Sequence, residues 1–73
     1  MDKSQEEYYR AVGQHTAILI DLQSAQKKLN KLRIIRPVSD SRVIALERRV
    51  GVLKRMALAS QRVVALKEEA LLR

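Results

Sequence analysis

With 73 residues, the chain has room for one domain, spanning residues 1–73, whose core is too small to be very stable without self-association or a partner. The lack of cysteine and the single histidine exclude disulfides and argue against a metal site, and no nucleophile-and-base pattern or glycine-rich phosphate loop indicates an enzyme. We therefore expect no catalytic residues, no cofactor and no metal, in a reducing, cytoplasmic compartment.

The amino-terminal sequence does not resemble a secretory leader, because MDKSQEEYYR is acidic and polar where a signal peptide is basic and then apolar. The most apolar run near the front, AVGQHTAILIDL, is interrupted by Gln14, His15 and Asp21. It also falls short of the ~20 apolar residues that a bilayer-spanning helix needs. We expect a soluble protein without a transmembrane segment.

The first predicted element is a helix over about residues 4–35. Ser4 and Glu7 have the spacing of a capping box, in which the serine hydroxyl and the glutamate carboxylate each accept from a backbone amide of the other. Core positions then recur at alternating spacings of three and four, as in a coiled coil. These positions are Tyr8, Ala11, His15, Ile18, Leu22, Ala25, Leu29 and Leu32. We expect Leu22, Leu29 and Leu32 to hold a helical hairpin closed.

A bend is predicted over residues 36–39. Arg36 precedes the only proline of the chain, Pro37, and the residue before a proline is driven out of helical geometry. Ser39 or Ser41 is then suited to cap a second helix. The sequence therefore predicts that the chain reverses its direction here.

The second predicted helix covers about residues 40–72 and carries an unusually wide apolar face. Every seventh residue forms a column along the helix, and four neighbouring columns are wholly or mostly apolar. They are Ala45-Val52-Ala59-Leu66, Val50-Ala57-Val64-Leu71, Leu46-Leu53-Ser60-Lys67 and Arg49-Met56-Val63-Ala70. These columns cover about 150° of the helix, more than one neighbouring helix can shield. We expect an all-α, two-helix antiparallel hairpin, a coiled coil completed by self-association or by a partner protein.

The surplus apolar face of the second helix is the predicted partner-binding surface. Its predicted contact residues are Leu46, Val52, Leu53, Met56, Ala59, Val63 and Leu66. The corresponding function is a non-enzymatic helical adaptor or co-chaperone that binds a partner protein, or a second copy of itself, through this face.

Positive charge gathers around the bend. Residues 27–55 contain ten cations against Asp40 and Glu47, a net charge of +8, whereas residues 1–26 sum to −2 and residues 56–73 to +1. Such cations complement helix carboxyl ends and flank coiled coils, but they also suit an anionic partner. The predicted anion or nucleic-acid contacts are Lys27, Lys28, Lys31, Arg36, Arg42 and Arg48. The alternative function is therefore a homo-oligomeric helical bundle whose basic bend binds nucleic acid.

Two residues within the helices allow both a structural and a functional interpretation. His15 at a core position would loosen the seam if it became charged near pH ~6, or it is held by a hydrogen bond to Gln61 or another side chain opposite it. Gly51 costs a helix about 1 kcal/mol relative to alanine, unless a close helix crossing uses its small size.

The plan of a capped helix, a bend at Arg36-Pro37-Val38-Ser39-Asp40 and a second helix with a broad face rich in alanine and valine resembles a known group. It is similar to the small helical-hairpin co-chaperones of bacterial type III secretion systems, the YscE-like group. The resemblance implies a cytosolic protein that binds a larger helical-repeat chaperone and helps to keep the needle subunit unpolymerised. Plasmid copy-control hairpins that dimerise and bind RNA share the same outline.

Overall fold

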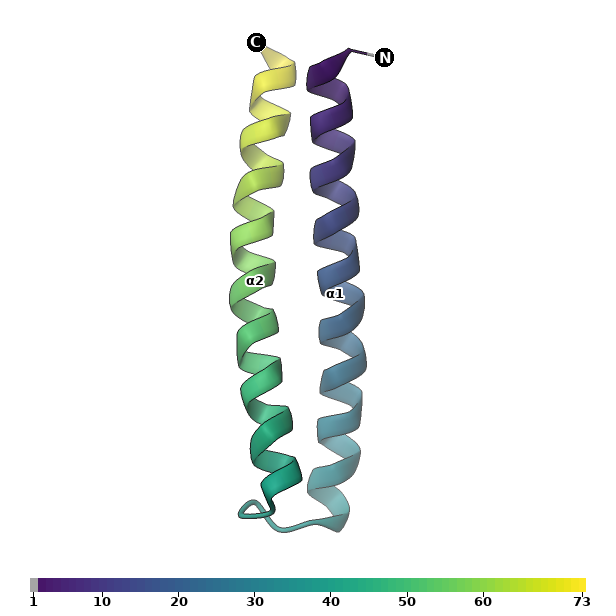
Figure 1. The fold of residues 1–73 in the computed structure, drawn as a ribbon, viewed down its shortest axis with the longest axis vertical. Helices are drawn as coiled ribbons and strands as arrows, with labels where there is room; N and C mark the ends of the chain where they lie inside the picture. The colour runs from purple at the N-terminus through teal and green to yellow at the C-terminus, as the bar shows by residue number, and fades with distance from the viewer. Residues whose placement is uncertain (1) are drawn as a thin grey trace.

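The computed structural model describes residues 2–73, which form two antiparallel helices joined by a short bend (Figure 1). Helix α1 comprises Lys3–Ile35 and helix α2 comprises Ser41–Leu72. The Cα atoms extend over 52 × 16 × 13 Å, so the molecule is a narrow rod with the bend at one end and both chain ends at the other. The predicted all-α hairpin is confirmed.

The amino-terminal cap of α1 differs from the prediction. Asp2 is the capping residue, and its carboxylate accepts a hydrogen bond from the backbone N–H of Ser4 at 3.4 Å. The expected capping box of Ser4 and Glu7 is therefore wrong, and Ser4 lies inside the helix. Aspartate caps helices as well as serine does, and the Glu7 carboxylate instead accepts a hydrogen bond from Lys67 of α2 at 3.1 Å.

The chain leaves α1 at the residue before the proline. Arg36 has extended backbone angles, φ −128° and ψ 146°, and its N–H donates to the Leu32 carbonyl at 2.8 Å. Pro37 then accepts a hydrogen bond through its carbonyl from the Asp40 N–H at 3.0 Å, which closes the turn. The steric conflict between a proline ring and a preceding helical residue thus ends the helix where the sequence predicted.

The second helix is capped by Asp40, whose carboxylate accepts from the Arg42 N–H at 2.8 Å. The expectation that Ser39 or Ser41 would cap this helix is wrong. Asp40 has the extended geometry that a capping residue needs, and its charge also favours the positive end of the helix dipole.

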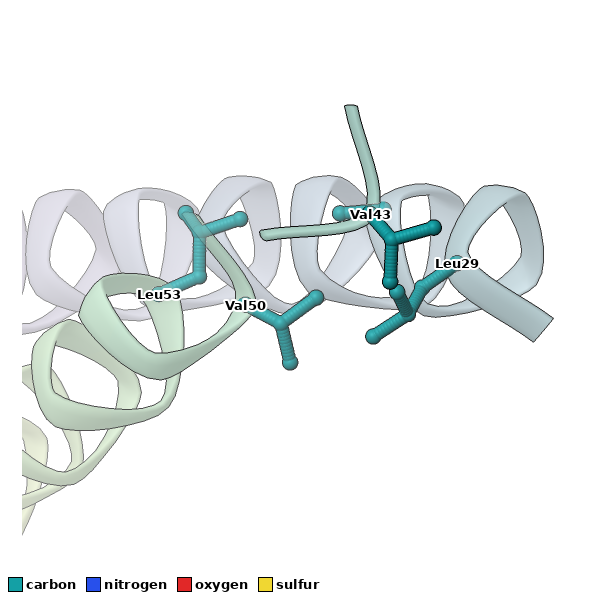
Figure 2. Packing of buried hydrophobic residues seen from close by; sticks show 5 residues of the cluster. Leu29, Val43, Val50 and Leu53 are labelled. Atoms are coloured by element: carbon teal, nitrogen blue, oxygen red, sulfur yellow. The ribbon is translucent and has the colours of Figure 1, made fainter. Parts of the chain in front are cut away.

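The best-packed part of the seam between the helices lies toward the bend. Ala25 and Leu29 of α1 and three residues of α2 form one buried cluster, part of which is visible in Figure 2. The α2 members are Val43, Val50 and Leu53. Leu22, Leu32 and Leu46 pack against this cluster, so the leucines expected to close the hairpin do so.

Toward the chain ends the seam becomes smaller and more polar. Ala11 and Ala57 are buried there. His15 forms a hydrogen bond through Nδ1 to the Ser60 hydroxyl, and that hydroxyl lies 3.0 Å from the Ala57 carbonyl, to which it donates. The Ser60 oxygen is therefore the acceptor for an N–H of His15. The histidine is held by a side chain opposite it, and the partner is Ser60 rather than Gln61.

Gly51 lies within α2, and a Cβ atom placed on it meets nothing within 4 Å. The hairpin thus makes no close crossing at this glycine. We predict that Gly51→Ala raises the free energy of unfolding by up to about 1 kcal/mol, because alanine restricts the unfolded chain and favours the helix. Urea unfolding followed by circular dichroism measures this change. Gly13→Ala, in a similarly open position of α1, is the matched control. Destabilisation by the change at Gly51 alone would contradict the prediction.

The cap at Asp40 should make stability depend on pH. The hydrogen bond from the Arg42 N–H lowers the pKa of the Asp40 carboxyl, and the charges of Arg42 and Arg36 lower it further. A carboxyl with a lowered pKa stabilises the fold above its unfolded-state value of ~4 and loses this contribution as the pH falls below it.

We predict that Asp40→Ala lowers Tm at neutral pH, whereas Asp40→Asn keeps most of the cap because its side-chain oxygen still accepts from the Arg42 N–H. The decline of Tm in acid should be shallower for Asp40→Asn than for the natural protein. Thermal unfolding at a series of pH values tests both statements. Equal Tm losses for the two variants at neutral pH would show that Asp40 does not act as a cap.

Candidate interaction surfaces

The rotation of α2 about its axis decides which of its apolar columns remain available. The two columns Val50-Ala57-Val64-Leu71 and Leu46-Leu53-Ser60-Lys67 lie along the seam with α1, where each member is buried or half-buried. We call these columns the inner seam of α2.

The structure corrects part of the predicted partner-binding surface. Leu53 is only 6% exposed and belongs to the buried cluster, and Leu46 packs against that cluster. Both leucines were expected to contact a partner. They instead hold α2 against α1, because they share a column that the hairpin itself uses, and they can reach a partner only if the hairpin opens.

The two remaining apolar columns point away from α1 and form a second heptad pattern. We call this row the outer seam; it consists of Ala45, Arg49, Val52, Met56, Ala59, Val63, Leu66 and Ala70. All eight residues are exposed, and their spacing alternates between four and three, as it does along the inner seam. Val52, Met56 and Val63 are 44–45% exposed and Leu66 is 65% exposed. Five of the seven predicted contact residues lie on this outer seam.

The chemistry of the outer seam suits a helix better than a small molecule. Its side chains are aliphatic or small, Arg49 is its one charged member, and the alanines allow close approach of another backbone. Arg48, Arg55 and Arg62 run beside it as the neighbouring heptad column. Among residues 2–73, no group of three or more His, Cys, Asp or Glu side chains is placed to hold a metal ion.

The basic residues around the bend are exposed, as the predicted anion contacts require. The predicted contacts Lys27, Lys28, Lys31, Arg36, Arg42 and Arg48 all lie on the surface. Arg42 lies 3.6 Å from the Asp40 carboxylate, and Arg33 lies 3.0 Å from that of Glu47. Within residues 2–73, the other eight of the ten cations between Lys27 and Arg55 form no salt bridge. The bend therefore keeps most of its positive charge available.

The structure also shows an apolar feature at the bend that the sequence reasoning missed. Ile34, Ile35 and Val38 are 83%, 72% and 74% exposed, which makes them among the most exposed large apolar residues of the molecule. We call these three residues the aliphatic tip. A signal was present in the sequence, because Ile34 and Ile35 fall outside the three-four pattern that ends at Leu32.

Neither helix contains a stretch that is both long enough and apolar enough to cross a membrane, as judged over the described residues. The chain matches no protein-family model, no curated protein and no solved structure.

A pair of alanine substitutions tests the division between inner and outer seams. We predict that Leu53→Ala lowers the free energy of unfolding by about 2–5 kcal/mol, because it leaves a cavity in the buried cluster. Met56→Ala, only three positions away on the outer seam, should cost less than about 1 kcal/mol in the monomer. Urea unfolding at low protein concentration measures both changes. Similar losses for the two variants would mean that α2 is rotated differently.

Proposed function

We propose that this protein is a non-enzymatic helical adaptor or co-chaperone that acts in the cytoplasm and binds a partner protein through the outer seam of α2. The observation that carries the proposal is that α2 has two heptad seams while α1 covers only one of them. A three-four repeat is the pattern by which helices pair. The outer seam therefore supports a role in which α2 pairs with a second helix.

The small core of the hairpin also supports a role in which the protein is stabilised by a bound partner. The buried residues are two leucines, two valines and three alanines: Ala11, Ala25, Leu29, Val43, Val50, Leu53 and Ala57. A core of this size rarely supplies more than about 3–5 kcal/mol of net stability. Burial of the outer seam would add roughly 25 cal/mol for each Å² of apolar surface removed from water. Binding and hairpin stability are coupled in this way, because a partner selects the folded hairpin.

The side chains beside the outer seam indicate what kind of partner fits. Arg48, Arg55 and Arg62 form a basic border along one flank. An amphipathic helix with its own apolar three-four stripe and acidic residues beside it would match both features. The apolar stripe would supply most of the affinity, whereas the acidic border would mainly raise the association rate and set the orientation.

A second copy of the chain is the other occupant to consider, since it supplies a matching outer seam. Charge favours an antiparallel arrangement, because parallel packing would bring together two copies of residues 27–55, each with a net charge of +8. In one antiparallel register Met56 lies opposite Ala59 and Val52 opposite Val63, so that a large residue meets a small one at the centre. This arrangement would give the homo-oligomeric bundle of the alternative function, and light scattering distinguishes it from a hairpin that needs a different partner.

We predict that Val52→Asp combined with Met56→Asp abolishes association, because two carboxylates would be buried against an apolar surface. Pull-down from the native host with mass spectrometry identifies the partner of the natural protein, and sedimentation measures complex formation. The matched control is Leu58→Asp combined with Ala65→Asp, which adds the same charge to exposed positions of the same helix outside both seams. Circular dichroism checks that both variants remain helical.

The double aspartate variant should lose the partner while the control retains it. Loss of binding in both variants would point to added charge rather than to the outer seam. Lys31→Glu combined with Arg36→Glu, at exposed sites near the bend, should leave the association intact. If only this charge reversal removed the partner, the adaptor function through the outer seam would be wrong.

A further inference from the structure

The aliphatic tip is not explained by the hairpin. Ile34 and Ile35 are the last two residues of α1, and Val38 lies in the bend. All three residues are highly exposed at the bend, the end of the rod opposite the chain ends, and none belongs to the inner or outer seam. The bend itself is closed by backbone hydrogen bonds at Arg36 and Asp40. Polar residues at the three aliphatic positions would serve the fold equally well.

Cations surround this tip. Lys28, Lys31 and Arg36 are exposed, lie within about two helical turns of the bend, and take part in no salt bridge of residues 2–73. Arg42 follows the bend and is only loosely paired, at 3.6 Å from Asp40. The narrow end of the rod thus combines exposed aliphatic side chains with positive charge. This combination is typical of peripheral protein segments that bind anionic lipid surfaces.

The aliphatic residues favour a lipid surface over a nucleic acid. Binding to a phosphate backbone uses cations and gains nothing from exposed isoleucine and valine side chains. Single-stranded nucleic acid is also held by stacking on aromatic side chains, and the two aromatic residues, Tyr8 and Tyr9, lie in the first turns of α1, far from the bend. The bend forms one narrow end of the rod, so its exposed aliphatic side chains can enter the interface of a bilayer without the two helices parting.

We propose that the bend is a membrane-contacting tip that inserts Ile34, Ile35 and Val38 among the headgroups of an anionic bilayer, while Lys28, Lys31, Arg36 and Arg42 bind the lipid phosphates and carboxylates. The aliphatic side chains supply apolar burial and the cations supply attraction to the charged surface. The long axis of the rod then stands away from the bilayer, so the outer seam of α2 stays free.

Vesicle co-sedimentation tests the tip directly. The natural protein should bind vesicles of mixed phosphatidylserine and phosphatidylcholine and should not bind phosphatidylcholine alone. The triple change Ile34→Ser, Ile35→Ser and Val38→Ser keeps every charge and should weaken binding by about tenfold or more. Leu72→Ser is the matched control, because Leu72 is 82% exposed at the opposite end of the rod. Circular dichroism should show unchanged helix content in both variants.

The charge contribution is measured separately with Lys31→Glu and Arg36→Glu. Each reversal removes one attraction and adds one repulsion, and it should weaken binding to the mixed vesicles by roughly tenfold. A short RNA serves as the competing anion. Tight RNA binding that the triple serine variant retains, together with failure to bind the mixed vesicles, would assign the bend to nucleic acid and overturn the proposal. Equal vesicle binding by the natural protein and the triple serine variant would also overturn it.

The depth of the tip gives an independent measurement. Since the sequence contains no cysteine, Val38→Cys provides a single thiol for an environment-sensitive fluorophore. Emission from this probe should shift to the blue on addition of mixed vesicles but not on addition of RNA. The same fluorophore on Leu72→Cys should show no shift with either anion. A shift at the opposite end but not at the bend would show that the wrong end of the rod contacts the bilayer.

Discussion

The rotation of α2 against α1 is the constraint on which the rest of the structure depends. Val43, Val50 and Leu53 are held in one cluster with Leu29 and Ala25, and this packing fixes which side of α2 faces inward. Because side chains recur around a helix with a fixed period, burial of these positions turns Val52, Met56 and Val63 toward solvent. A rotation of α2 by one column toward the outer seam would bury Met56 and Val63 and would expose Val50 and Ala57 of the inner seam.

Different interactions hold α1 and α2 together in the two halves of the hairpin. Near the bend, branched side chains fill the space between the helices, whereas near the chain ends alanines, the hydrogen bond of His15 with Ser60 and the ion pair of Glu7 with Lys67 take their place. That ion pair is partly exposed to water, where such pairs add little stability. The hairpin is therefore expected to fray from its chain ends, while the half near the bend retains its packing. The hydrogen bond from Lys67, together with its charge, lowers the pKa of the Glu7 carboxyl, so this pair contributes at neutral pH and is lost in acid as Glu7 becomes protonated.

The strongest signals of the sequence concern periodicity and the proline. The three-four row from Tyr8 to Leu32 predicted the face that α1 turns to α2, and Pro37 predicted the point of reversal, because both depend on local sterics and spacing. The caps were harder to predict, since Asp2 and Ser4, or Asp40 and its serine neighbours, can all accept a backbone hydrogen bond and only the path of the chain decides between them. Periodicity also left open which of the four apolar columns of α2 would face α1, so Leu46 and Leu53 were assigned to the wrong surface. The aliphatic tip was missed because its residues belong to no repeat.

The return of the chain brings its two described ends side by side at one extremity of a 52 Å rod. Two dyes attached there, one at each end, would be close enough for efficient energy transfer while the two helices are packed against each other. Parting of the helices from that extremity would lengthen the distance between the dyes and dim the acceptor, even if the bend stayed intact. Energy transfer between the two dyes therefore reports whether the helices have separated, and the labels modify neither the outer seam of α2 nor the bend.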